Sequence, residues 1–138
     1  MAKTDIYSAR KRSEIMRRVR GKDTAPELLV RRILRSLRVR FRGHVAGLPG
    51  RPDIAVPGMR KILLINGCFW HQHPGCSRAK LPQTRRGWWK RKLTRNSERD
   101  KKQIQALRRL GWSVRVIWEC QTRDSIKLAG SLRAFLKE

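Results

Sequence analysis

The sequence predicts an α/β domain in three layers, with helices on both faces of a mixed central sheet. The first observation is the aliphatic run at residues 62–65, which is typical of a strand buried on both faces. The second is helical apolar spacing before and after this run, and the third is an alternating segment near the end. The resulting element order is ααβββαβα. We expect a single domain over residues 1–138, a length sufficient for one core.

The amino-terminal part is expected to contain a basic arm and a well-capped helix. Residues 1–20 are predicted to be a mobile arm that includes a weak amphipathic helix from residue 8 onward. In the following helix Thr24 can cap, Pro26 occupies the first turn and Glu27 completes a Thr-x-x-Glu capping box. The apolar face of this helix is predicted to consist of Leu28, Leu29, Ile33, Leu34 and Leu37.

Three strands are predicted next. Residues 39–42 alternate as a strand does, and residues 52–56 and 61–65 form two further strands joined by Pro57-Gly58. Asp53 is placed inside the second of these strands.

The carboxy-terminal part is predicted to alternate between helix and strand. A long basic helix over residues 89–110 stops at Gly111, a residue that favours helix ends. Residues 112–118 alternate as a strand, and residues 124–137 form the closing helix. The inward face of the long helix is predicted to be Leu93, Ile104, Leu107 and Leu110.

The charge of the chain points to a polyanionic partner. The sequence has 35 Lys and Arg against 10 Asp and Glu, a formal charge of +25. Such a charge repels itself in a compact domain unless a polyanion neutralises it, so we expect nucleic acid as the partner and binding that weakens as salt rises. No apolar run is long enough for a signal peptide or a membrane span. Charge alone leaves an RNA-binding or architectural protein open beside an enzyme.

Cysteine and histidine are concentrated at a potential metal site. Cys68, His73 and Cys76 have the spacing Cys-x4-His-x2-Cys, and Cys120 follows the last predicted strand. Three thiolates and one imidazole make a closed tetrahedral zinc site, and an odd number of cysteines does not suit a disulfide framework. The alternative is that Cys68 and Cys120 are small buried apolar residues and His73 lies at the surface. We favour structural zinc.

Scarce carboxylates make Asp53 a candidate cation ligand. A buried carboxylate is costly unless it is paired, and a hard cation such as Mg²⁺ prefers oxygen ligands. The alternative is an ion pair with Arg51 or a turn-associated Asx interaction. Glu27 is explained as structure by its capping position, and His71 is left over from the zinc set and suits a base.

Other polar residues are expected to have structural roles. Glu98 and Asp100 are assigned as partners of basic residues on their own helix. Glu119 is placed beside the zinc site, and His44 is expected to have no catalytic role.

Aromatic residues flank the candidate base. Phe69 and Trp70 are consecutive on a polar loop, which makes burial of both unfavourable, and we expect them to contact nucleic acid bases. Core packing is the alternative. It is assigned to Trp112, Trp118 and one of the pair Trp88 and Trp89.

The chain resembles the very-short-patch-repair (Vsr) DNA mismatch endonucleases in a series of motifs that occur in one order over nearly its whole length. The first motifs are Arg12-Ser13-Glu14-Ile15-Met16-Arg17, Asp23-Thr24-Ala25-Pro26-Glu27 and Leu48-Pro49-Gly50-Arg51-Pro52-Asp53. The later motifs are Gly67-Cys68-Phe69-Trp70-His71, Asn96-Ser97-Glu98-Arg99-Asp100, Gly111-Trp112 and Val116-Ile117-Trp118-Glu119-Cys120. The resemblance implies a restriction-endonuclease-like core and nicking of one strand beside a T:G mismatch, the product of deaminated 5-methylcytosine.

The resemblance also implies a role for individual residues. Asp53 would bind Mg²⁺ together with the backbone carbonyl of Ile65, and His71 would be the general base that activates water. Glu27 and Asn96 would hold metal-bound water, which replaces the purely structural interpretation of Glu27. The implied zinc ligands are Cys68, His73, Cys76 and Cys120.

The DNA contacts implied by the resemblance come from Phe69, Trp70 and Trp89 as wedges in the duplex, and from Arg17 and Asn66. Asn66 is a departure, because the family has a histidine that helps at the phosphate in this position. Pro74-Gly75 lengthens the loop before Cys76, and the Glu-x-Lys motif of restriction-like nucleases is absent.

The leading hypothesis is therefore a Mg²⁺-dependent, zinc-stabilised nicking endonuclease that acts on mismatched double-stranded DNA as a monomer in the bacterial cytoplasm, near the nucleoid. The alternatives are a nicking nuclease of the same fold with another specificity, and a zinc-stabilised DNA-binding module without activity. The bases around the mismatch, the number of Mg²⁺ ions and any repair partner are not determined by the sequence.

Overall fold

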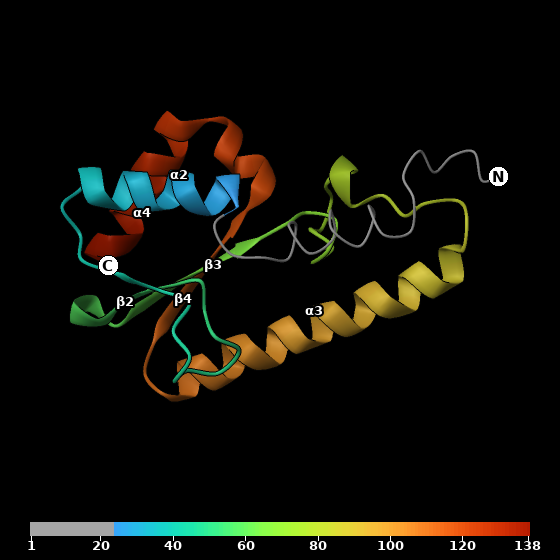
Figure 1. The fold of residues 1–138 in the computed structure, drawn as a ribbon, viewed down its shortest axis with the longest axis horizontal. Helices are drawn as coiled ribbons and strands as arrows, with labels where there is room; N and C mark the ends of the chain where they lie inside the picture. Colours follow the sequence, from blue (N-terminus) through green and yellow to red (C-terminus); the bar gives the residue numbers. More distant parts are fainter. Residues whose placement is uncertain (1–23) are drawn as a thin grey trace.

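The computed structural model describes residues 24–138, which form three layers (Figure 1). Helices α2 (Ala25–Ser36) and α4 (Ser125–Lys137) cover one face of a central sheet. Helix α3 (Arg86–Arg109) runs along the opposite face. The layered α/β prediction is thereby confirmed. The predicted arm at residues 1–20 and the expected DNA contact at Arg17 lie outside the described residues.

Within residues 24–138 the sheet has four strands in the order β1-β2-β3-β4, with bounds Arg42–Gly43, Ile54–Val56, Lys61–Asn66 and Ser113–Trp118. The first three strands are antiparallel, and β4 is parallel to β3. The predicted mixed sheet is therefore confirmed. In the described part of the chain, the larger elements are connected by the short 3₁₀ helices η2 (Pro57–Met59), η3 (Ser77–Ala79) and η4 (Glu119–Arg123).

Strand β3 lies between two apolar cores. On one side Leu63 packs with residues of α2 and α4, among them Val30, Leu34 and Leu132. On the other side Ile62 and Leu64 pack with Leu107 of α3. Both faces of β3 are thus buried, which is why residues 62–65 are aliphatic at every position rather than alternating.

Two predicted strand boundaries are wrong. The strand expected at residues 39–42 is reduced to Arg42–Gly43, because its partner β2 ends at Val56 and residues 39 and 40 lie beyond the ladder. His44 directly after β1 has a φ of +48°, outside the β region, which ends the strand. The next strand begins at Ile54 instead of residue 52, since Pro52 has no N–H for the ladder. Asp53 therefore precedes β2 and is not part of it.

The helices follow the prediction more closely. Thr24 caps α2, and its Oγ1 accepts a hydrogen bond from the Glu27 N–H at 3.4 Å. Leu28 and Leu110, both assigned to apolar faces, are instead about half exposed. Leu28 lies off the stripe formed by Val30, Ile33 and Leu34, and Leu110 caps α3 beyond its last turn. Within residues 24–138, none of the helices combines the length and apolarity needed to cross a membrane.

Candidate functional site

The exit of strand β3 brings Asp53 beside the backbone of Ile65. The antiparallel register pairs Ile54 with Leu63, so the residue before β2 faces the end of β3. Asp53 Oδ2 accepts a hydrogen bond from the Ile65 N–H at 2.8 Å. The N–H and C=O of one strand residue point toward the same neighbour, so the Ile65 carbonyl is expected on the Asp53 side. The two groups predicted to share a cation are adjacent.

The surroundings of Asp53 favour loss of its charge unless a cation is present. Burial raises the pKa of Asp53 from 3.8 to about 6, and the nearby Glu27 carboxylate raises it further. The Ile65 N–H and the side chains of His44 and His71 lower this pKa, but they do not offset the effect of burial. A divalent cation beside Asp53 would favour the carboxylate, so an oxygen-lined site of excess negative charge fits a hard metal ion.

Glu27 extends this negative region from the first turn of α2. Its side chain is buried, and Oε2 lies 3.2 Å from His44 Nε2 and 3.6 Å from Arg31 Nη2. His44 was expected to have no catalytic role, and its ring contacts the Glu27 carboxylate at the site. No local sequence pattern indicates the contact between His44 and Glu27, because it depends on the conformation of the turn after β1.

The candidate base is held by a carboxylate from α3. His71 Nδ1 lies 2.6 Å from Asp100 Oδ2. Ser97 Oγ also donates to the His71 carbonyl at 3.4 Å. Asp100 was assigned as a partner of basic residues on its own helix, and its bond to His71 corrects that assignment. Asn96 and Asp100 are four residues apart and share one helix face, a signal that could have predicted the pair.

Asn96 contacts the same loop. Its Nδ2 donates to the Trp70 carbonyl at 3.2 Å, and its Oδ1 accepts a hydrogen bond from Arg99 at 2.6 Å. Helix α3 therefore holds residues 70 and 71 through three of its side chains. Asn96 thus lines the cleft and fixes the backbone at Trp70.

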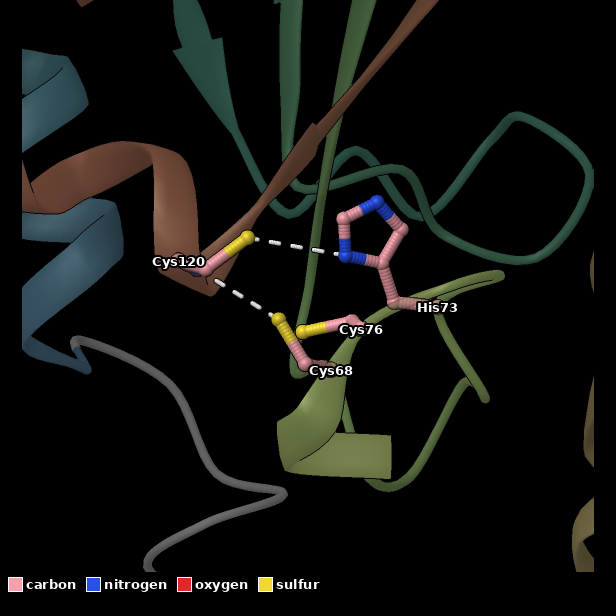
Figure 2. Close-up of side chains that lie close together, drawn as sticks. All are labelled: Cys68, His73, Cys76 and Cys120. Carbon is pink, nitrogen blue, oxygen red and sulfur yellow. Dashed lines mark hydrogen bonds between the residues drawn. The ribbon is translucent and has the colours of Figure 1, made fainter. Parts of the chain in front are cut away.

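The cysteines and His73 form one cluster, as predicted (Figure 2). One ligand atom from each of Cys68, His73, Cys76 and Cys120 lies within 4.8 Å of the others. The cause is the register of β3 and β4, which pairs Asn66 with Trp118. Cys68 and Cys120 each follow two residues later, and the Cys120 N–H donates to Cys68 Sγ at 3.4 Å.

This cluster fits zinc in its donor set. The three cysteines are free thiols, and burial raises the pKa of Cys68 to about 12. A bound cation would reverse that shift, since zinc binds the thiolate. His73 is oriented by Trp118, on which its ring stacks at 4.2 Å with an interplanar angle of 11°.

Phe69, Trp70 and Trp89 form an aromatic cluster at the mouth of the site. Their ring centroids lie 5.2 to 6.0 Å apart, and all three rings are partly exposed. Trp88 contacts Trp89 edge-on and is exposed, so neither residue of that pair is in the core, contrary to the prediction for one of them. Partly exposed aromatic rings among basic residues are typical of nucleic-acid contact.

An open cavity of about 1290 Å³ collects most of these groups. Its lining includes Glu27, Asp53, Ile65, Asn66, Phe69, Trp70, His71, Asn96, Asp100 and Glu119. Asn66 is buried at the end of β3.

Sequence comparison connects this arrangement with known proteins. The family profile described as "DNA mismatch endonuclease Vsr" matches residues 4–78. Vsr of Escherichia coli strain K12, a DNA mismatch endonuclease, is 40% identical over 124 residues, which are 90% of this chain and 79% of that protein. The chain belongs to the Vsr family. The expected family resemblance is thereby confirmed.

Two nicking enzymes are similar to this chain over nearly its full length. The Type II nicking enzyme V.XorIIP of Xanthomonas oryzae pv. oryzae is 43% identical over 133 residues, which are 96% of this chain and 97% of that protein. The Type II nicking enzyme V.NmeAIP of Neisseria meningitidis is 34% identical over 135 residues, which are 98% and 96% of the two chains. The chain is thus an endonuclease of the Vsr family that acts on DNA phosphodiester bonds.

The Vsr profile does not reach the whole site. Residues 4–78 include Glu27, Asp53 and His71, whereas Asn96, Asp100 and Cys120 lie beyond that match. The tertiary structure connects the two halves, because α3 and the turn after β4 bring the later residues to the earlier ones.

Proposed function

We propose that the protein is a Mg²⁺-dependent endonuclease that nicks one strand of double-stranded DNA beside a T:G mismatch, in very-short-patch repair of deaminated 5-methylcytosine. The observation that carries the proposal is one cleft that contains a carboxylate pair, a carboxylate-oriented histidine and exposed aromatic rings. We also infer a restriction-endonuclease-like core, action as a monomer, and a place in the bacterial cytoplasm near the nucleoid.

The oxygen groups at the end of β3 fit Mg²⁺. Asp53 and the Ile65 carbonyl would hold the ion, with Glu27 and Asn96 holding its bound water. The ion supplies charge stabilisation for the phosphoryl oxygens and the leaving group. The hydrogen bond from the Ile65 N–H restricts the rotation of the Asp53 carboxylate, which supports this role.

His71 is the proposed general base. Its Nδ1 bonds to Asp100, so the proton on the ring is expected at Nδ1. Nε2 is then left as an acceptor for a proton from the attacking water, and Asp100 stabilises the imidazolium that forms. Ser97 holds the His71 backbone, which limits the positions that the ring can take.

Replacing the orienting carboxylate tests this role. Asp100→Asn is expected to lower kcat by about 100-fold or more, because an amide does not hold the Nδ1–H tautomer as a carboxylate does. Single-turnover nicking of a T:G duplex measures the effect. KM and the affinity for DNA should stay close to wild type, and Glu98→Gln on an exposed face of α3 provides a matched control. Equal rates for the two variants would contradict the assignment.

The aromatic cluster is proposed to test base-pair stability. Phe69, Trp70 and Trp89 would insert between base steps, which costs a few kcal/mol per step and less where pairing is already poor. Mismatch selectivity then arises in part from deformability of the duplex. Asn66 and Arg17 are proposed as additional DNA contacts.

Competition between Mg²⁺ and a proton at Asp53 predicts a specific pH dependence. Nicking should increase with pH as Asp53 loses its proton, with the acid limb near the metal-free pKa of about 6 when Mg²⁺ is scarce. The base His71 must also be unprotonated at any Mg²⁺ concentration, so the competition is measured as the Mg²⁺ concentration for half-maximal nicking at each pH. Below pH 6 that concentration should fall by up to about tenfold for each unit of increase in pH. A half-maximal Mg²⁺ concentration that does not change with pH would argue against Asp53 as the ligand.

A panel of duplexes tests the function directly. Purified protein with Mg²⁺ should nick T:G duplexes and leave matched duplexes intact. Asp53→Ala should abolish the nick and preserve binding. Absence of nicking on every mismatched and matched duplex would reject the enzymatic proposal. It would favour the zinc-stabilised DNA-binding module, which has no need of Asp53 or of the His71–Asp100 pair.

A nicking nuclease with another specificity is the second candidate. It is favoured by the near full-length similarity to two proteins named Type II nicking enzymes. Nicking that is confined to other mismatches or sequence contexts in the same panel would support it.

A further inference from the structure

His44 is a partly buried histidine beside the proposed cation site that the mechanism above does not use. It follows β1 directly, and its N–H donates to the Asp53 carbonyl at 2.9 Å. Its φ of +48° is uncommon for a residue with a side chain. The turn after β1 thus places His44 against the backbone of one candidate metal ligand.

The ring of His44 lies at the other carboxylate. Nε2 is 3.2 Å from Glu27 Oε2, and the His44 side chain is 18% exposed. Nε2 itself is shielded from solvent and has no hydrogen-bond partner of ordinary geometry within residues 24–138. A small rotation of either side chain would complete a bond, so the pair is close to an oriented donor and acceptor.

Arg31 competes for the same oxygen. Its Nη2 lies 3.6 Å from Glu27 Oε2, one helical turn along α2. A Cβ on Gly43 would lie 3.2 Å from that guanidinium, so the glycine leaves the room that Arg31 occupies. Glu27 is therefore positioned between a cation on its own helix and the imidazole from the β1 turn.

We propose that His44 is a positioning residue that holds the Glu27 carboxylate toward Asp53 and thereby sets the affinity of the site for a divalent cation. This inference rests on the proposed function. The two carboxylates repel each other, and a glutamate side chain has several rotamers available. Without His44, Glu27 turns toward Arg31 and the cation loses one of the groups that hold its water.

Two amide substitutions separate the ring contact from the turn. In His44→Gln the amide nitrogen lies near the position of Nε2, so contact with Glu27 is retained. In His44→Asn the side chain is too short to reach Glu27, while asparagine tolerates a positive φ well. His44→Asn thus preserves the backbone and removes the contact.

The first measurement is Mn²⁺ binding to the zinc-loaded protein without DNA, followed by electron paramagnetic resonance of the free ion. We expect His44→Asn to weaken Mn²⁺ binding by about 10-fold, as loss of an orienting partner typically does, and His44→Gln to restore most of it. The Mg²⁺ concentration for half-maximal nicking should shift in parallel, with kcat at saturating Mg²⁺ little changed. Unaltered Mn²⁺ affinity in His44→Asn would overturn the proposal.

A double-mutant cycle with Glu27→Gln tests whether His44 acts through Glu27. The His44→Asn effect on Mn²⁺ binding should largely disappear in the Glu27→Gln background. An undiminished effect would reject this route. Zinc content and Tm equal to wild type exclude a general loss of structure. If wild type nicks no duplex but Mn²⁺ binding follows this pattern, the proposed function fails and the role of His44 stands.

Discussion

Asp53→Asn is expected to abolish nicking and, at the same time, to stabilise the Mg²⁺-free protein. The amide removes the anionic cation ligand, and loss of a metal-binding carboxylate should reduce kcat by about 1000-fold or more. The amide oxygen still accepts the hydrogen bond from the Ile65 N–H, so the local backbone is preserved. Activity and stability are therefore expected to change in opposite directions.

The stability gain has a definite pH dependence. Burial raises the pKa of Asp53 from 3.8 to about 6, so the folded protein binds the Asp53 proton more tightly than the unfolded chain does. The contribution of this group to the unfolding free energy of the wild type is therefore fully present below pH 3.8 and is lost as pH rises through 6. The full difference in unfolding free energy between the Asp53→Asn variant and wild type is about 2 kcal/mol after allowance for partial exposure, or roughly 5 °C in Tm. It should shrink toward zero near pH 4.

Thermal unfolding across pH measures this effect, in buffer without Mg²⁺ and without a chelator, so that zinc remains bound. Added Mg²⁺ should stabilise wild type and leave Asp53→Asn unchanged. A variant that is less stable than wild type at pH 8 without Mg²⁺ would show that Asp53 does not carry uncompensated charge.

Cys120→Ser is expected to release the metal from the Cys/His cluster and to unfold the loop around it. Cys120 contributes the ligand from the β4 side, and its N–H and Sγ contact Cys68 and His73. A structural zinc site supplies a large share of the folding energy of the segment it holds. We expect less than one equivalent of zinc, a Tm lower by about 10 °C or more, and loss of nicking.

Thr122→Ala is a matched control in the same turn. Thr122 Oγ1 donates to the Glu119 carbonyl at 2.6 Å but offers no ligand to the cluster. Metal analysis should give one zinc for this control and for wild type. A fully folded wild-type protein without metal would refute the zinc assignment.

The sequence predicted those parts of the fold whose signal is local. Strand β3 and helix α3 were predicted because an unbroken aliphatic run and a helical apolar spacing each persist over their length. The Cys/His cluster was predicted because cysteine is scarce and Cys68 and Cys120 each follow a strand. Family resemblance, rather than periodicity, supplied the roles of Glu27 and Asn96.

Other parts depend on tertiary contacts that a local pattern does not contain. Asp100 bonds with a residue 29 positions away, and its spacing to basic neighbours offered a simpler local explanation. His44 reaches Glu27 only because a positive φ ends β1 at Gly43. The boundaries of β1 and β2 were predicted wrongly because these two strands pair with each other through only two residues each, which is too short for an alternating pattern to define their ends.

The parallel pairing of β3 with β4 has a consequence for how the chain folds. Parallel strands require a long crossover connection, and here the connection between β3 and β4 contains α3. Pairing the two strands closes this connection into a large loop, which costs chain entropy. Cys68 and Cys120 are 52 residues apart in the sequence, as are the paired residues of β3 and β4. Zinc bound by both cysteines would therefore close the same loop that the strand pairing closes. Folding should then be faster at higher zinc concentration. A zinc-starved cell would accumulate chains in which β3 and β4 do not pair and the cleft at the end of β3 does not form.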